Sequence, residues 1–149
     1  MAVSFQNADI AFRLSSPTAL KNFISSSFES EAGKKLSATY VFCSDDYLLR
    51  INQDFLQHDY YTDIITFPLS ETDRKLEAEI YISIDRIREN AGKLKVPFEH
   101  ELYRVIFHGV LHLIGLKDKT AAQKEAMRKA EERWIKAFVR ENPITPPLS

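Results

Sequence analysis

The segment from Phe107 to Asp118 constrains the fold of this chain most strongly. It places His108 and His112 four residues apart within a run of apolar residues. On a helix, positions i and i+4 share one face, so the two imidazoles can converge on one ion. Gly115 follows three residues later and suits a left-handed helix end, which turns the chain back toward the same face. The segment therefore predicts a helix that ends at a polar site.

Asp118 lies three residues beyond this glycine, where the turn brings it toward the two histidines as a third ligand. Three protein ligands and one open position are typical of a catalytic zinc site. Burying imidazoles in an apolar run is costly unless they have partners, and a metal ion supplies one. The alternative is an accidental pair of histidines at helical spacing. We predict a metal site of His108, His112 and Asp118 at the C-terminal end of a helix.

The composition of the 149-residue chain is typical of one globular domain, with 44% hydrophobic and 28% charged residues. The formal net charge is −1, so the chain has no overall electrostatic signature of a nucleic-acid-binding protein. Between residues 117 and 140, however, eight basic residues outnumber four acidic ones. This local charge of +4 can follow an RNA backbone, although a salt-bridged helix face is the commoner meaning.

Cys43 is the only cysteine of the sequence, which excludes an intramolecular disulfide and a cysteine-rich zinc site. It lies in an apolar run and is interpreted as a small buried hydrophobic residue. No apolar stretch approaches the length of a membrane span, and the N-terminus lacks a signal-peptide pattern. We therefore expect a cytoplasmic protein with no membrane partner.

Helical and strand periodicities alternate along the chain. One or two short strands are expected within residues 1–14, and further strands at 36–43, 64–67 and 78–84, with Pro68 ending the second of these three. Helices are expected at 17–32, 45–56, 85–94, 98–114 and 120–140. We predict one α/β (α+β) domain over residues 1–142, with a roughly four-stranded mixed sheet and helices packed against it. The proline-rich residues 143–149 are expected to form a mobile tail.

The spacing of the histidine motif is close to that of long-motif zinc proteases, H-E-x-x-H-x-x-G-x-x-H. In those enzymes, the glutamate after the first histidine is the general base. Gly109 occupies that position here and can neither accept nor donate a proton. A zinc protease-like hydrolase is therefore the less favoured alternative.

Residues 108–115 resemble the H-G-x-L-H-L-x-G signature of the YbeY family of endoribonucleases, which are bacterial ribosomal RNA maturation factors. Residues 52–67 resemble a second block of this family, N-x-x-[YF]-R-x-x-D-x-x-T-D-V-L-S-F. The segment Glu79–Ile82 is similar to its G-D-I-x-I strand, and Met127 and Glu131 also fit. The resemblance extends from about residue 48 to residue 132 in the same order.

This resemblance implies a metal-dependent hydrolase that cleaves single-stranded RNA, with one Zn²⁺ per chain. It implies a role in maturation of small-subunit ribosomal RNA precursors and in ribosome quality control, with the ribosome or its associated proteins as partners. The catalytic zinc ligands of the family carry over onto His108 and His112. Its third ligand is usually a histidine, and Asp118 occupies that position here. A carboxylate is an acceptable zinc ligand, makes the ion a weaker Lewis acid, and slightly favours a harder ion.

The resemblance also fails at one functional position, because Leu56 stands where the family has an arginine thought to engage substrate phosphate. Leucine cannot form a charge-assisted bond to phosphate. Candidate replacements are Arg104, Lys117 and Lys119, although exposed basic side chains are usually only solvated surface. A non-catalytic ribosome-associated factor with a structural metal is therefore kept as an alternative to phosphodiester hydrolysis by an activated water.

Four other polar positions receive structural interpretations. Thr62 and Asp63 are typical of a turn at the start of a strand. His58 and His100 lie in polar segments and are interpreted as ordinary surface residues.

Overall fold

The structure, a computed structural model, describes residues 3–142, which form four strands and five helices. In chain order these are β1 (Val3–Asn7), α1 (Pro17–Ala32), β2 (Lys35–Cys43), α2 (Asp45–Leu56), β3 (Ile64–Glu71), β4 (Lys75–Ser83), α3 (Ile84–Leu94), α4 (Phe98–Ile114) and α5 (Ala121–Glu141). This confirms the predicted α+β fold with a four-stranded mixed sheet. The predicted tail over residues 143–149 lies outside the described residues.

The strands are ordered β1-β2-β4-β3 across the sheet, with β1, β2 and β4 parallel and β3 antiparallel to β4. The prediction that Pro68 ends a strand is wrong, because β3 continues to Glu71 and forms a hairpin with β4. Since β3 is an edge strand, a proline can occupy it without breaking the ladder on its paired side. The register with β4 shifts between Pro68 and Ser70, which absorbs the irregularity.

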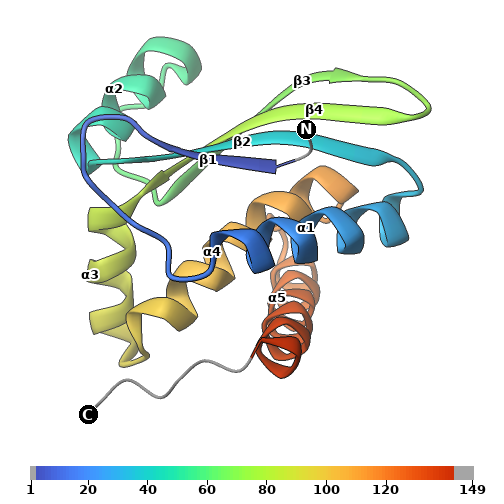
Figure 1. Cartoon of the computed structure of the whole chain (residues 1–149). Helices are drawn as coiled ribbons and strands as arrows, with labels where there is room; N and C mark the ends of the chain where they lie inside the picture. Colours follow the sequence, from blue (N-terminus) through green and yellow to red (C-terminus); the bar gives the residue numbers. More distant parts are fainter. Residues whose placement is uncertain (1–2, 143–149) are drawn as a thin grey trace.

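Helices cover the two faces of the sheet unequally (Figure 1). On one face, α1 and α4 lie under the strands and α5 packs on α4. The large core lies there, and alternate residues of two strands point into it: Leu36, Ala38, Tyr40 and Phe42 from β2, and Leu76, Ala78, Ile80 and Ile82 from β4. On the opposite face, α2 covers only a small cluster around Cys43, Leu48 and Ile65.

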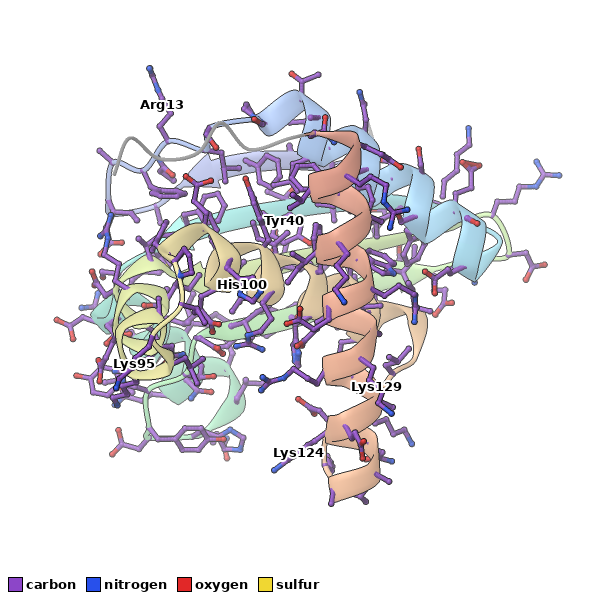
Figure 2. The ribbon with its side chains drawn as sticks, turned by 90° about the horizontal axis from the view of Figure 1, so that it is seen from below. Arg13, Tyr40, Lys95, His100, Lys124 and Lys129 are labelled. Atoms are coloured by element: carbon purple, nitrogen blue, oxygen red, sulfur yellow. The ribbon has the colours of Figure 1, made fainter. Side chains whose placement is uncertain are left out.

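Helix α4 is fixed on both of its sides. The Tyr40 hydroxyl donates a hydrogen bond of 2.8 Å to the carbonyl oxygen of Ile106, tying the sheet to the helix (Figure 2). On the other side, Phe107 packs against Trp134 and Phe138 of α5, with ring centroids 5.7 and 6.0 Å apart. The position of α4 is therefore set by core packing.

None of the helices within residues 3–142 is long and apolar enough to cross a membrane.

Cys43 has the buried, structural character that the sequence predicts. Its side chain is fully buried at the end of β2, and its Sγ lies 3.5 Å from the carbonyl oxygen of Ile82. Burial, with the negative charges of Asp9, Asp45 and Asp85, raises the pKa of the Cys43 thiol to about 12. The thiol thus stays protonated at neutral pH and does not serve as a nucleophile.

Candidate active site

The last turn of α4 and the loop after it form one side of the site. Gly115 ends the helix with a positive φ of 125°, and its N–H donates to the carbonyl oxygens of Leu111 (3.2 Å) and His112 (3.1 Å). The chain then turns back, so that Asp118 Oδ2 lies 3.3 Å from His108 Nε2. The helix end expected at Gly115 is confirmed, and the turn places Asp118 on the histidine side of α4.

His112 lies beside His108, with the ring centroids 6.0 Å apart and the ring planes 11° from parallel. The sequence led us to expect both imidazoles to be buried, which is wrong for His112, whose side chain is exposed. Within residues 3–142, no three His, Cys, Asp or Glu side chains already lie close enough together to hold a metal ion. The three predicted ligands thus lie near one another without forming a ready cluster. His108 is paired with Asp118, and His112 lies beside His108.

Glu131 of α5 supports His108 from behind. Glu131 is 1% exposed, and its Oε2 lies 2.6 Å from His108 Nδ1. This contact leaves Nε2 on the side of Asp118. A carboxylate on the second ring nitrogen is the usual support of a metal-binding histidine, because it fixes the ring orientation and tautomer. Two imidazoles and one carboxylate, as in His108, His112 and Asp118, are side chains of the kinds that can hold a metal ion.

Sequence reasoning did not find this role of Glu131, although it noted that Glu131 fits the family pattern. The two partners are 23 residues apart on different helices, so no local spacing reports their contact. Burial lowers the pKa of His108, but the hydrogen bond and charge of Glu131, with Asp118 and Asp63, outweigh burial and raise that pKa overall.

Arg104, one turn before His108 on α4, lies within a group of carboxylates. Its Nε and Nη2 donate to Glu101 at 2.9 and 2.5 Å, and its Nη1 donates to Glu131 at 3.3 Å. Asp63 Oδ2 lies 3.8 Å from Nη2. Glu101 and Glu131 are buried, and Arg104 balances their charge. The geometry therefore places this predicted substrate-binding residue beside His108 and Asp118, with its donors already engaged by carboxylates.

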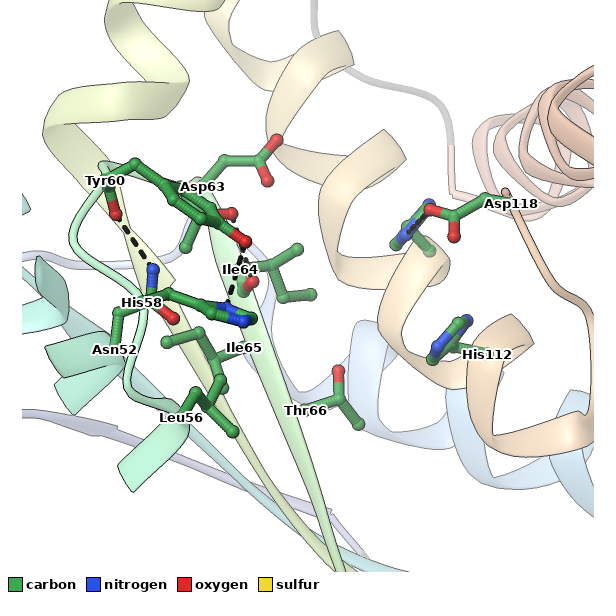
Figure 3. A pocket seen from close by; sticks show the side chains of 12 residues that line it. Asn52, Leu56, His58, Tyr60, Asp63, Ile64, Ile65, Thr66, His112 and Asp118 are labelled. Atoms are coloured by element: carbon green, nitrogen blue, oxygen red, sulfur yellow. Dashed lines mark hydrogen bonds and ion pairs between the residues drawn. The ribbon is translucent and has the colours of Figure 1, made fainter. Parts of the chain in front are cut away.

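A pocket of about 340 Å³ opens between α4 and the segment that joins α2 to β3. One side, which we call the α4 wall, is formed by His108, His112 and Asp118. The opposite side, which we call the α2–β3 wall, is formed by Asn52, Leu56, His58 and Tyr60. Asp63, Ile64 and Thr66 line the pocket between the two walls (Figure 3).

The pocket adds to two interpretations made from the sequence. His58 is exposed, as expected, and it also lines the α2–β3 wall. Asp63 begins the turn into β3 as expected, but its side chain also faces the pocket. Burial raises the pKa of Asp63, against the opposing effects of Arg104 and His108. Leu56 lines the same wall, so the position at which the family has arginine does face the site.

Gly109 allows α4 to lie close to the sheet. A Cβ added at this position would stand 3.0 Å from Ile64 Cδ1 and 3.3 Å from two atoms of Ile80. A glutamate here would point at these isoleucines of β3 and β4. In this fold, the position that carries the general base of a zinc protease is therefore packed closely against Ile64 and Ile80.

Basic side chains flank the α4 wall on its other side. A smaller hollow of about 200 Å³ is lined by His108, Asp118, Lys124 and Arg128 among others. Lys124 and Lys129 point to opposite sides of α5 (Figure 2). The predicted substrate-binding residues Lys117 and Lys119 are exposed on the turn after α4 and line neither this hollow nor the pocket. The excess of basic residues on the last helix was the signal for Lys124 and Arg128.

Comparisons with known proteins agree with this architecture. Residues 4–139 match the family model described as Endoribonuclease YbeY. The chain is 45% identical over 130 residues to Endoribonuclease YbeY of Cytophaga hutchinsonii, covering 87% of this chain and 91% of the relative. It is 47% identical over 136 residues to Endoribonuclease YbeY of Flavobacterium psychrophilum, covering 91% and 96%.

The fold is also similar to a solution structure of a Thermotoga maritima protein, with a TM-score of 0.62 and 23% identity over 99% of both chains. The match to the family model and the identity to these relatives show that the chain belongs to the Endoribonuclease YbeY family.

Proposed function

We propose that this chain is a metal-dependent endoribonuclease that cleaves single-stranded RNA during maturation of small-subunit ribosomal RNA. The observation that carries the proposal is the pocket in which His108, His112 and Asp118 face a second wall across an open space. In this proposal, an extended strand would lie in this space beside the histidines. Membership of a family of endoribonucleases supplies the reaction class.

His108 Nε2, His112 and Asp118 would hold one Zn²⁺ per chain, and Glu131 would keep His108 oriented for it. The ion supplies Lewis-acid activation of a water and of a phosphoryl oxygen. With Asp118, the metal has two nitrogen ligands and one oxygen ligand in place of three imidazole nitrogens. This ligand set favours harder ions such as Mn²⁺ more than the usual family site does. Zn²⁺ is nevertheless the ion that two histidines and one carboxylate commonly hold in hydrolases.

The phosphate backbone would run from the pocket toward Lys124 and Arg128. Both side chains are exposed beside His108 and Asp118, and neither is buried in the carboxylate group that surrounds Arg104. Lys124 supplies a mobile point charge, and Arg128 a planar donor set for phosphate oxygens. Arg104 would act through Glu101 and Glu131 by holding the support of His108 in place.

The RNA in question would be the precursor of the small-subunit ribosomal RNA, with the ribosome or its associated proteins as the larger partner. Support for this part comes from the family. The same support extends the proposal to ribosome quality control and to a cytoplasmic place of action.

The proposal is tested with metal-loaded wild type, His112→Ala and Asp118→Asn. Metal content is measured on each purified protein, and cleavage of a single-stranded RNA of small-subunit precursor sequence is followed in parallel. We expect about one metal ion per wild-type chain, loss of metal in His112→Ala, and loss of cleavage in both variants. His100→Ala is the matched control, because His100 is a histidine of the same helix that lies outside the pocket.

Equal cleavage by wild type and His112→Ala would contradict the proposal. A chain that loses its fold on chelation, yet cleaves no RNA when metal-loaded, would instead be the non-catalytic factor with a structural metal.

A further inference from the structure

We propose that Tyr60 and His58 form a stacking platform for one base of the single-stranded RNA, next to the phosphate that is cleaved. This inference rests on the proposed function and names the recognition surface of the same site. Both side chains line the pocket, across from His112 and Asp118 (Figure 3). A nucleotide that presents its phosphate to the α4 wall therefore has its base beside the α2–β3 wall.

The platform is exposed and already ordered. Tyr60 is 57% exposed, although it is a large aromatic residue beside a pocket. The rings of Tyr60 and His58 are stacked, with centroids 5.1 Å apart and planes 19° from parallel, and the Tyr60 hydroxyl lies 3.0 Å from His58 Nδ1. Because each ring already fixes the other, a base can stack on the pair without first ordering it.

The backbone beneath the platform is held by α2. Asn52 is 2% exposed, and its Nδ2 donates a 2.8 Å hydrogen bond to the carbonyl oxygen of Tyr60. The His58 N–H donates to the carbonyl oxygen of Asn52 at 3.0 Å. Between them, Gln57 adopts a positive φ of 56°. The chain thus makes a sharp turn after α2, and one buried side chain fixes the turn that presents both rings.

The chemistry of the pocket selects a base over a phosphate at this wall. No lysine or arginine is among the described residues that line the pocket. Leu56, at the position of the family's arginine, adds apolar surface beside the rings. A wall of two stacked rings and an aliphatic side chain is suited to the face of a base, and it offers no lysine or arginine to a phosphate. Bases of duplex RNA have no free face, so the occupant is single-stranded.

The test measures binding of fluorescent single-stranded RNA by anisotropy in the His112→Ala background, where the RNA is not cut. Adding Tyr60→Ala is expected to weaken binding about tenfold, the usual effect of losing one stacked base. Tyr60→Phe keeps the ring but loses the hydroxyl contact with His58 Nδ1, so its affinity should lie between those of the parent and Tyr60→Ala. Phe55→Ala is the matched control, because Phe55 is 71% exposed near the end of α2 but does not line the pocket.

A set of RNAs with one abasic nucleotide at successive positions locates the base. One abasic position should weaken binding by the parent, and that same position should have no effect when Tyr60→Ala is present. Equal binding by Tyr60→Ala and the parent, or an equal loss with Phe55→Ala, would overturn the platform.

Failure of the platform and failure of the proposed function give different results. If wild type cleaves RNA and Tyr60→Ala cleaves it with the same KM, only the platform is overturned. If wild type binds RNA through Tyr60 but does not cleave it when metal-loaded, the platform stands and the proposed nuclease function is wrong. If wild type neither binds nor cleaves single-stranded RNA, both are overturned.

Discussion

The α4 wall and the α2–β3 wall face each other across one pocket, but they are supported in opposite ways. Behind the α4 wall, the carboxylates of Glu101 and Glu131 are buried and share the guanidinium of Arg104. The α2–β3 wall presents the exposed rings of His58 and Tyr60, which are held through backbone hydrogen bonds to Asn52.

This difference indicates a division of labour. Ligands of a metal ion must keep their geometry within a fraction of an ångström, and a buried charge network provides that rigidity. A surface that accepts different bases along an RNA needs flat, exposed rings and little else. We therefore expect substitutions behind the α4 wall to affect stability and metal binding strongly, and those in the α2–β3 wall to affect RNA binding with small effects on stability.

The largest effect is expected for Gly109→Glu. The new side chain would start 3.0 Å from Ile64 Cδ1 and place an unpaired carboxylate among isoleucines. Overpacking and burial of an unpaired charge together should lower the free energy of unfolding by more than about 4 kcal/mol. Urea denaturation followed by circular dichroism measures this change.

Smaller substitutions keep this prediction testable if the glutamate variant does not fold. Nothing lies within 4 Å of a Cβ added at Gly92 in α3, so Gly92→Ala should stabilise the protein by up to about 1 kcal/mol through helix propensity. Gly109→Ala should be less favourable than Gly92→Ala because its methyl group meets Ile64 and Ile80. Equal gains would mean that close packing of α4 on the sheet does not constrain position 109.

The next effect is expected for Arg104→Met, which removes the charge shared by Glu101 and Glu131. Leaving a buried carboxylate without its partner should cost about 3–5 kcal/mol of unfolding free energy. Arg128→Met is the matched control, because Arg128 is 60% exposed and lies 3.9 Å from the same Glu131. It should change stability by less than about 0.5 kcal/mol. Similar costs for both variants would contradict the contrast between buried and exposed support.

Glu131→Gln is expected to weaken metal binding about 10- to 100-fold, because the amide no longer holds His108 as a carboxylate does. Competition with a chelating dye measures the metal affinity. Thermal denaturation of the metal-free protein measures separately the stability that is lost with the pair between Glu131 and Arg104. Glu132→Gln serves as the control, since the ion pair that Glu132 forms within residues 3–142 is with His100, at 3.6 Å. Lower stability with unchanged metal affinity would mean that Glu131 supports the fold alone.

Local periodicity was sufficient to predict most of the fold. The alternation of Ile80 and Ile82 with polar residues gave β4, and the apolar run around the histidine pair gave α4. The hairpin was missed because a proline argues against a strand in isolation, whereas the position of β3 at the sheet edge removes the objection. Edge position depends on the whole sheet and is not encoded in the local segment.

The candidate site was predictable only where its residues are close in sequence. The spacing from His108 to Asp118 predicted that the two histidines share one face of a helix and that a turn follows the helix. Glu131 and Tyr60 reach the site from other elements, at separations fixed by the packing of α5 and by the turn after α2. Burial of Arg104 among carboxylates likewise follows from the tertiary structure, and in the sequence it resembles any exposed helical arginine.

The smallest effect is expected for Asn52→Ala, which removes the tie between α2 and the platform. The carbonyl oxygen of Tyr60 loses a 2.8 Å hydrogen bond, but water can replace the donor at this exposed residue. Stability should therefore fall by only about 1 kcal/mol. Amide hydrogen exchange over residues 57–61 should accelerate, and affinity for single-stranded RNA should fall because the rings are no longer held in place.

Gln53→Ala separates this tie from a general loosening of the loop. The Gln53 side chain also bonds to the segment, through Asp59 at 2.6 Å, but both groups are exposed. Its loss should change stability by less than about 0.5 kcal/mol and leave hydrogen exchange at residues 57–61 near that of the wild type. If Asn52→Ala and Gln53→Ala behave alike, the α2–β3 wall is held by many weak contacts. If Asn52→Ala alone releases the segment, one buried amide orders a wall that is otherwise open to solvent, and the contrast with the α4 wall lies in how each is anchored.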